Sequence, residues 1–131
     1  MDNKKENILL LPGDGIGPEV NNALKEVINS LDKNIGVPFN VEEGLIGGAS
    51  YDAYGTPLSD KILEKAIKAD AIILGSVGGP KYDQLPFEVK PERALLKLRK
   101  QLDLYANIRP AKVFNALKDA SSLKSEIVEN M

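Results

Sequence analysis

The 131-residue sequence contains no cysteine, no histidine and no tryptophan, and only 5% of its residues are aromatic. Without cysteine or histidine the chain cannot form a disulfide, a thiolate zinc site, a histidine metal site or a histidine-based catalytic triad. Long apolar runs are also missing, which excludes a secretory signal and a membrane span. We therefore expect a soluble, cytoplasmic protein that has no membrane partner.

An excess of charge of one sign is absent as well. Seventeen Lys and Arg residues face 19 Asp and Glu residues, which gives a formal net charge of -2. Nucleic-acid-binding proteins usually present a net basic face, so no nucleic-acid partner is expected. The 43% of hydrophobic residues is enough to build the core of an ordinary domain.

Apolar runs and amphipathic segments alternate along the chain. Strands are predicted at 7–12, 38–46 and 70–76, and helices at 17–34, from Ser59 onward, and at 92–102. We interpret 47–57 as a loop, 80–91 as a polar, proline-containing stretch and 103–114 as extended. Strands alternating with helices at this spacing predict an α/β fold, with a mostly parallel sheet and flanking helices.

Details of two predicted helices can be tested against the structure. Pro18 suits the first turn of the helix at 17–34, and Ser59 is expected to cap the next helix. The inward-facing positions should be Val20, Leu24, Val27, Ile28 and Leu31 in the first helix, and Ile62, Leu63, Ala66 and Ile67 in the second.

Two glycine-rich loops follow predicted strands. The first, LLLPGDGIGPEV (9–20), has Pro18 where a dinucleotide-binding fingerprint needs its last glycine, and it lacks the Lys-Ser/Thr ending of a phosphate-binding loop. It indicates a tight strand-to-helix turn, whose amides can still lie near an anion. The second, ILGSVGGPKYD (73–83), is either a turn or a ligand-binding loop, because ligands bind beyond the carboxyl ends of parallel strands.

The segment PERALLKLRKQLDLYANIRP (91–110) combines apolar and charged side chains unusually. On a helix, Glu92, Leu95, Leu96 and Arg99 share one face, whereas Ala94, Leu98 and Leu102 form another face that can anchor the helix. A returning strand could bring Arg109 close to Arg99. Two arginines bind carboxylates or phosphates well, so a small polyacid with a branched apolar tail is one interpretation. Solvated arginines beside packing leucines are the other.

Four motifs in this order closely resemble the N-terminal portion of the isopropylmalate dehydrogenases, a family of β-decarboxylating dehydrogenases of leucine biosynthesis. They are LPGDGIGPEV, GGASYDAYGTPL, LGSVGGPKYD and ALLKLRKQLDLYANIRPAKVF. The resemblance implies an isocitrate/isopropylmalate dehydrogenase-like fold, incomplete in this chain. It also implies NAD-dependent oxidation of the 2-hydroxyl of 3-isopropylmalate and decarboxylation to the 2-keto acid, with Mg or Mn as metal cofactor and a homodimer as the full enzyme.

The resemblance also assigns residues to roles. Arg99 and Arg109 would bind the malate carboxylates, and Leu95 and Leu96 would contact the isopropyl group. Residues along the cofactor would be Gly79, Pro80, Lys81, Tyr82, Asp83, Gln84, Leu85 and Glu92. The catalytic tyrosine and lysine, a third substrate arginine and the metal-binding aspartates belong to later segments of the family. No catalytic or metal-binding residue is therefore expected within this chain, and the isolated chain is predicted to be inactive.

The same resemblance bears on domain organisation and on related substrates. Residues 1–110 would form the N-terminal half of a discontinuous first domain, and 111–131 the start of a second. Isocitrate dehydrogenases carry serine and asparagine where this chain has Arg93 and Leu95, so isocitrate is disfavoured. Homoisocitrate and tartrate dehydrogenase relatives stay open, as does a non-catalytic α/β module that binds a small carboxylate or a nucleotide.

Overall fold

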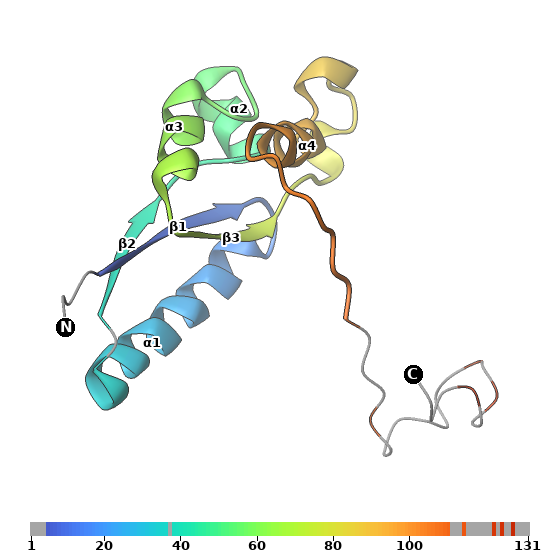
Figure 1. Cartoon of the computed structure of the whole chain (residues 1–131). Helices are drawn as coiled ribbons and strands as arrows, with labels where there is room; N and C mark the ends of the chain where they lie inside the picture. The colour runs from blue at the N-terminus through green and yellow to red at the C-terminus, as the bar shows by residue number, and fades with distance from the viewer. Residues whose placement is uncertain are drawn as a thin grey trace.

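The computed structural model describes residues 5–36 and 38–110, together with four single positions at 114, 122, 124 and 127. The elements are β1 (Glu6–Gly13), α1 (Gly17–Ile35), β2 (Phe39–Glu43), α2 (Gly48–Tyr54), α3 (Asp60–Lys68), β3 (Ala71–Ser76), short 3-10 turns at Pro80–Tyr82 and Phe87–Val89, and α4 (Glu92–Gln101) (Figure 1). Every strand and helix predicted from residues 7–102 is therefore present, with shifts of a few residues at some ends.

The three strands form a parallel sheet in the order β2-β1-β3. Central β1 pairs with β2 from Glu6 opposite Phe39, and with β3 from Ile8 opposite Ala71. Each strand is connected to the next through helices, as parallel pairing requires. The structure thus confirms the predicted α/β class and the parallel sheet.

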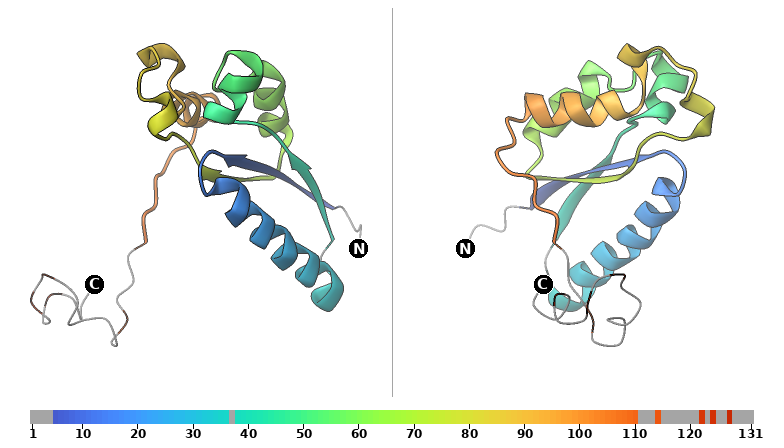
Figure 2. Two further views of the ribbon diagram at one scale, coloured as in Figure 1. Left: turned by 180° about the vertical axis from the view of Figure 1, so that it is seen from behind. Right: turned by 90° about the vertical axis from the view of Figure 1, so that its right-hand side faces the viewer.

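Helices cover both faces of this sheet. Helix α1 lies on one face, while α2, α3 and α4 gather on the other (Figures 1 and 2). Because side chains alternate along a strand, Ile8 and Leu10 of β1 pack with Ile28 of α1, whereas Leu9 and Leu11 join the opposite cluster. That second cluster draws residues from both α3 and α4, including Ile62, Ala66, Ala94 and Leu98. Strand β1 is therefore buried on both faces and forms the centre of the core.

The segment 47–57, predicted as a loop, contains helix α2, so that prediction is wrong. Two glycines at its start concealed the helix, because glycine is a poor helix former. The N-cap Gly47 offers no side chain to cap the helix. The first backbone amides of α2 are instead bound by a carboxylate from another part of the chain, Asp14. Local sequence contains no signal for such a distant partner.

The predicted inward-facing stripes of two helices are only partly correct. In α1, Ile28 is buried and Leu24 packs beside it, but Val20 and Val27 are more than half exposed. In α3, Ile62 and Ala66 are buried, whereas Ile67 is exposed. A three-stranded sheet offers each helix a narrow surface, so only the central line of each stripe is covered. Ser59 occupies the N-cap position of α3 but makes no capping hydrogen bond with its side chain, and Pro18 lies in the first turn of α1 as predicted.

Among the residues that the structure describes, no helix has the length and apolar character needed to cross a bilayer.

The start of α1 depends on a close backbone approach at Gly17. A Cβ atom at this position would lie 1.9 Å from the carbonyl oxygen of Pro12, whereas one at Gly15 would meet nothing within 4 Å. Gly17→Ala should therefore destabilise the chain by about 3 kcal/mol, because strand and helix must separate. Gly15→Ala, at φ +58°, should cost only about 1 kcal/mol of left-handed strain. Urea unfolding of both variants checks this, and equal losses would contradict the close-approach argument.

Candidate functional site

Asp14 is a buried carboxylate at the carboxyl end of β1, with only 6% of its surface exposed. Its Oδ2 accepts hydrogen bonds from the backbone amides of Gly48 and Gly78, both at 2.8 Å, and its Oδ1 accepts one from Ala49 at 2.7 Å. Three amides compensate for the loss of hydration that a buried carboxylate suffers. The arrangement fixes three chain segments around one side chain.

The backbone of Asp14 makes further bonds to the end of β3. Its amide donates to the carbonyl of Ser76 at 2.6 Å, and the Ser76 hydroxyl donates to the Asp14 carbonyl at 2.5 Å. The glycine loop after β1, the first turn of α2 and the glycine loop after β3 are thereby held together. All three lie at the edge of the sheet where ligands bind in parallel α/β proteins.

A cavity of about 410 Å³ opens at this edge, which we call the glycine-loop cavity. Its lining combines the loops after β1 and β3 with residues of α2: Gly13, Asp14, Gly15, Ala49, Asp52, Gly78, Gly79, Pro80, Lys81 and Tyr82. Four of the predicted cofactor residues, 79–82, line it. Asp83, Gln84 and Leu85 follow the turn and are not part of this lining.

Asp52 of α2 binds the loop that follows β3. Its Oδ2 accepts hydrogen bonds from Lys81 Nζ at 2.6 Å and from the Tyr82 hydroxyl at 2.9 Å. The hydrogen bond from Lys81, followed by that from Tyr82, lowers the pKa of Asp52 below its ordinary value. The pKa of Tyr82 is raised, mainly by burial and secondly by its hydrogen bond to Asp52. Because the pKa of Asp52 is lowered in the folded state, its hydrogen bonds stabilise the fold at pH values above the ordinary carboxyl pKa of about 4. This stabilisation is lost as the pH falls through the lowered pKa.

Glu92, the first residue of α4, reaches the same loop. A Cβ atom at Gly78 would lie 2.3 Å from Oε1 of Glu92, so the carboxylate rests directly against this glycine. Gly78 has φ +98°, a conformation that glycine adopts readily. The structure thus brings Glu92 to the loop that contains the predicted cofactor residues, in contact with Gly78, which lies fourteen positions earlier in the sequence.

The two faces of α4 differ as the sequence predicts. Ala94 and Leu98 are buried in the core and Leu102 packs against it, which makes them the anchoring face. Leu95 and Arg99 line an apolar groove of about 380 Å³ between α3, β3 and α4. Leu96, half exposed, lines a different cavity of about 570 Å³ on the other side of the helix, beside Arg93 and Lys97. The predicted leucine pair is therefore divided between two cavities.

Arg109 is not brought to Arg99 in the described structure. Residues 104–110 contain neither helix nor strand, and Arg109 is exposed on this segment, which leads away from α4 (Figure 2). The lining of the groove that holds Arg99 ends at Leu104. The proximity of the two arginines stays a prediction. The predicted domain boundary at 110 and 111 is likewise untested, because all of 111–131 except four single positions lies outside the described residues.

The described residues fit the two expected cofactors differently. A loop of glycines beside a carboxylate and a lysine offers backbone groups and polar side chains to a nucleotide, and no side chain occupies the space over Gly15 or Gly79. For a metal ion the fit fails within the part of the chain that the structure describes, since no three His, Cys, Asp or Glu side chains converge there. Metal ligands remain an expectation for a segment after Met131.

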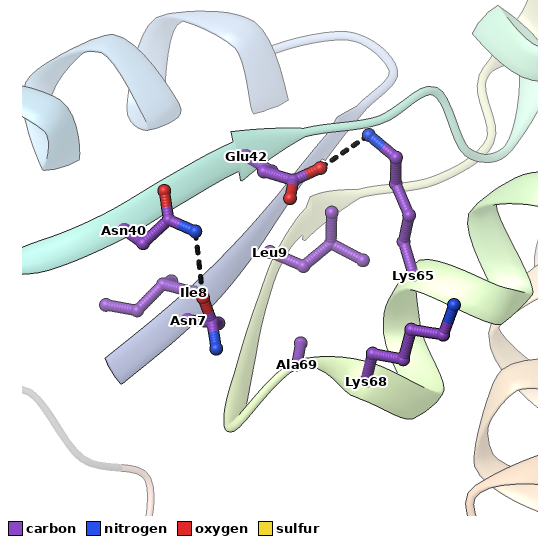
Figure 3. A pocket seen from close by; sticks show the side chains of 8 residues that line it. All are labelled: Asn7, Ile8, Leu9, Asn40, Glu42, Lys65, Lys68 and Ala69. Carbon is purple, nitrogen blue, oxygen red and sulfur yellow. Dashed lines mark hydrogen bonds and ion pairs between the residues drawn. The ribbon is translucent and has the colours of Figure 1, made fainter. Parts of the chain in front are cut away.

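Another cavity lies on the sheet face that α3 covers and reaches the amino ends of the strands, and four of its polar side chains bond to one another in pairs. Figure 3 shows Lys65 of α3 paired with Glu42 of β2 at 2.5 Å, and Asn40 donating to Asn7 at 2.8 Å. The cavity measures about 190 Å³. Ligands of parallel sheets bind at the opposite ends of the strands, so this cavity is not the candidate site.

The residues that organise the candidate site, Asp14 and Asp52, were not identified from the sequence. Asp14 follows Gly13 and precedes Gly15 in the first glycine loop, a pattern that indicates a turn and hides the carboxylate. Asp52 lay in a segment predicted as a loop. The sequence shows one aspartate in the motif LPGDGIGPEV and one in GGASYDAYGTPL. It contains no signal that either carboxylate contacts the third motif, LGSVGGPKYD.

A parallel sheet covered by helices on both faces, with a glycine-lined cavity at the carboxyl ends of its strands, places the chain in the parallel α/β class. A sequence model described as isocitrate/isopropylmalate dehydrogenase matches residues 7–131. The chain belongs to this family.

Named relatives agree with this assignment. The 3-isopropylmalate dehydrogenase of Cereibacter sphaeroides is 57% identical over 125 residues, which are 95% of this chain and 34% of the relative. That of Pelagibacter ubique is 56% identical over 128 residues, covering 98% of this chain and 35% of the relative. The chain thus spans about a third of the length of these relatives.

Solved structures show the same fold. The isocitrate dehydrogenase of Methylococcus capsulatus superposes with a TM-score of 0.61 and 30% identity, covering 76% of this chain and 26% of that one. A β-decarboxylating dehydrogenase of Thermococcus kodakarensis, in its apo form, gives a TM-score of 0.56 and 28% identity, with 76% and 27% covered.

Asp14→Asn tests the buried carboxylate. An amide in its place turns an NH₂ group toward backbone N–H donors and leaves at least one of them unpaired, so the free energy of unfolding should fall by about 3 kcal/mol. Asp32→Asn, an exposed aspartate of α1, should change it by less than about 0.5 kcal/mol. Urea unfolding gives both values, and similar losses in the two variants would show that the three amides do not depend on Asp14.

Proposed function

We propose that this chain forms the N-terminal part of an NAD-dependent 3-isopropylmalate dehydrogenase of leucine biosynthesis. The complete enzyme oxidises the 2-hydroxyl of 3-isopropylmalate, releases the neighbouring carboxylate as carbon dioxide and converts the resulting enol to the 2-keto acid. NAD, when bound, accepts the hydride. This chain contributes binding surfaces, and the proton-transfer residues belong to the remaining segment.

The observation that carries the proposal is the placement of α4. Its first residue, Glu92, contacts Gly78 of the glycine-loop cavity, and Leu95 and Arg99, about one and two turns further along, share an apolar groove. One helix thus connects the glycine-lined cavity of about 410 Å³ with a guanidinium beside apolar surface. A carboxylate with a branched hydrocarbon tail suits such a combination. The names of the most similar relatives support the same substrate.

Within this proposal each side chain has a definite task. Arg99, joined by Arg109 once the chain is complete, binds and orients the malate carboxylates through paired N–H donors. Leu95 contacts the isopropyl group from the groove that Arg99 lines, and Leu96, which lines the neighbouring cavity in the 131-residue chain, joins this contact in the complete site. Glu92 and residues 79–85 lie along the cofactor, with Glu92 beside the nicotinamide.

Leu95 also favours isopropylmalate over isocitrate. A third substrate carboxylate facing this leucine would lose its hydration without gaining a hydrogen-bond donor, a penalty of several kcal/mol. Leu95 is only half-buried and lines the groove with Arg99, so it is available to a ligand. Homoisocitrate and tartrate are discriminated less clearly by this position.

The remaining features of the proposal concern the complete enzyme. It works as a homodimer in the cytoplasm, with Mg or Mn bound by residues after Met131. The 131-residue chain alone is inactive. A non-catalytic α/β module that binds a small carboxylate or a nucleotide is the competing interpretation.

The decisive experiment joins residues 1–131 to the remaining segment of the Cereibacter sphaeroides relative and measures NADH formation with 3-isopropylmalate. Turnover by this chimera, and none by the 131-residue chain, is the expected result. Calorimetric titration of the chain alone with NAD and 3-isopropylmalate addresses the competing module, because tight, stoichiometric binding without turnover by the chimera would favour it.

Arg99→Ala in the chimera should raise the KM for 3-isopropylmalate strongly, about a hundredfold, because a substrate carboxylate loses its charged partner. Lys33→Ala is the control, since this exposed cation lies in the last turn of α1, on the opposite face of the sheet from α4. Steady-state kinetics compare the two variants. Unchanged kinetics in Arg99→Ala would remove this arginine from the site.

Replacing both Leu95 and Leu96 by alanine should impair turnover of 3-isopropylmalate more than turnover of unsubstituted malate. Only the branched substrate gains from apolar contact, and loss of that contact lowers kcat/KM by roughly tenfold or more. The ratio of kcat/KM for the two substrates is the measurement. Equal losses for both substrates would contradict the assignment of these leucines to the isopropyl group.

A further inference from the structure

We propose that Asp52 is a positioning residue that holds the turn Pro80–Tyr82 in place over the glycine-loop cavity and thereby sets the affinity for the nicotinamide cofactor. One oxygen of Asp52, Oδ2, accepts hydrogen bonds from two consecutive residues of the turn, Lys81 and Tyr82. The inference rests on the proposed function, because it takes the turn to be part of the cofactor site.

The loop after β3 is attached at two points on either side of Gly79. The Gly78 amide donates to buried Asp14, while Lys81 and Tyr82 donate to Asp52. Within the turn itself, the Tyr82 amide donates to the Gly79 carbonyl at 2.9 Å. Gly79 has φ +154°, and a Cβ atom at this position would meet no other atom within 4 Å. The exposed middle of the loop therefore depends on its two attachments for its position.

The ring of Tyr82 adds a steric attachment to the polar one. A Cβ atom at Gly48 would lie 2.1 Å from the ring carbons, so the ring rests directly on the first residue of α2. Lys81 Nζ lies 5.2 Å from the centroid of the same ring. Asp52, on the following turn of α2, completes an arrangement in which the helix holds the turn through one ring and one carboxylate.

This arrangement differs from an ordinary surface ion pair. Exposed ion pairs contribute little to the free energy of unfolding. The pair between Glu42 of β2 and Lys65 of α3 is an ion pair of this ordinary kind. Asp52, by contrast, accepts hydrogen bonds from two consecutive residues of one turn and lines the glycine-loop cavity together with them. Its effect is therefore expected on the geometry of the loop and on ligand binding, more than on global stability.

The test uses the chimera described above and the variant Asp52→Asn. The KM for NAD should rise about tenfold, the change expected when charge-assisted hydrogen bonds are lost, while kcat and the KM for 3-isopropylmalate change less than about twofold. Glu42→Gln, which breaks the comparable pair away from this cavity, should change none of the three values. An unchanged KM for NAD in Asp52→Asn would overturn the proposal.

Tyr82→Phe and the double variant Asp52→Asn/Tyr82→Phe separate the hydrogen bond from the ring contact. The ring stays on Gly48 in Tyr82→Phe, so its effect on the KM for NAD should be smaller than that of Asp52→Asn. The effects should be less than additive in the double variant, because Asp52→Asn weakens, and Tyr82→Phe removes, one and the same hydrogen bond. Additive effects would show that Asp52 and Tyr82 act independently, which would contradict the proposal even if Asp52→Asn folds poorly.

A second measurement keeps this proposal distinguishable from the proposed function. Amide hydrogen exchange in the 131-residue chain should accelerate at Tyr82 and Asp83 in Asp52→Asn, but not in Glu42→Gln. Acceleration together with a chimera that never turns over would refute the dehydrogenase function and leave the attachment of the turn intact. Unchanged exchange together with an active chimera would refute the attachment alone.

Discussion

Burying one carboxylate, that of Asp14, imposes the constraint on which the rest of this structure depends. A desolvated charge must be matched by donors, and this one is matched by three backbone amides from segments that are 34 to 64 positions away. Secondary structure alone would leave the two glycine-rich loops and the first turn of α2 unconnected at the sheet edge. The carboxylate connects them, and glycine is needed around it because backbone must approach closely. At Gly47, for example, a Cβ atom would lie 2.5 Å from Oδ2.

The site follows from this constraint in successive layers. Asp14 fixes Gly78, Gly78 provides the surface on which Glu92 rests, and Glu92 begins the helix that carries Leu95 and Arg99. The buried Ala94 and Leu98 anchor the same helix to the core that β1 shares with α3. Arg99 on α4 is thus placed relative to the loop after β3 through a short series of direct contacts, with the sheet as the rigid base.

Sequence reasoning recovered the parts of the structure that depend on local patterns. The apolar run of β1 and the anchoring face of α4 are local signals, and both were predicted correctly. Helix α2 was missed because its N-terminal amides are bound by Asp14, which comes from a distant segment. Val20 and Val27 were wrongly predicted to face inward, because the narrow sheet limits how much of α1 is buried. Glu92 and residues 79–85 were named from family resemblance, whereas Asp14 and Asp52 emerge only when three-dimensional contacts are known. Hydrogen bonds across more than thirty positions leave no period in a sequence.

The contact between Gly48 and the ring of Tyr82 has an evolutionary consequence. The two positions occupy one volume, in which the missing side chain of the first is replaced by the ring of the second. Neither position can be substituted independently, because a larger residue at 48 is compatible only with a smaller one at 82. Substitutions at positions 48 and 82 should therefore be correlated in the family. Such a correlation would indicate a contact between α2 and the loop after β3 in sequences whose structures have not been determined.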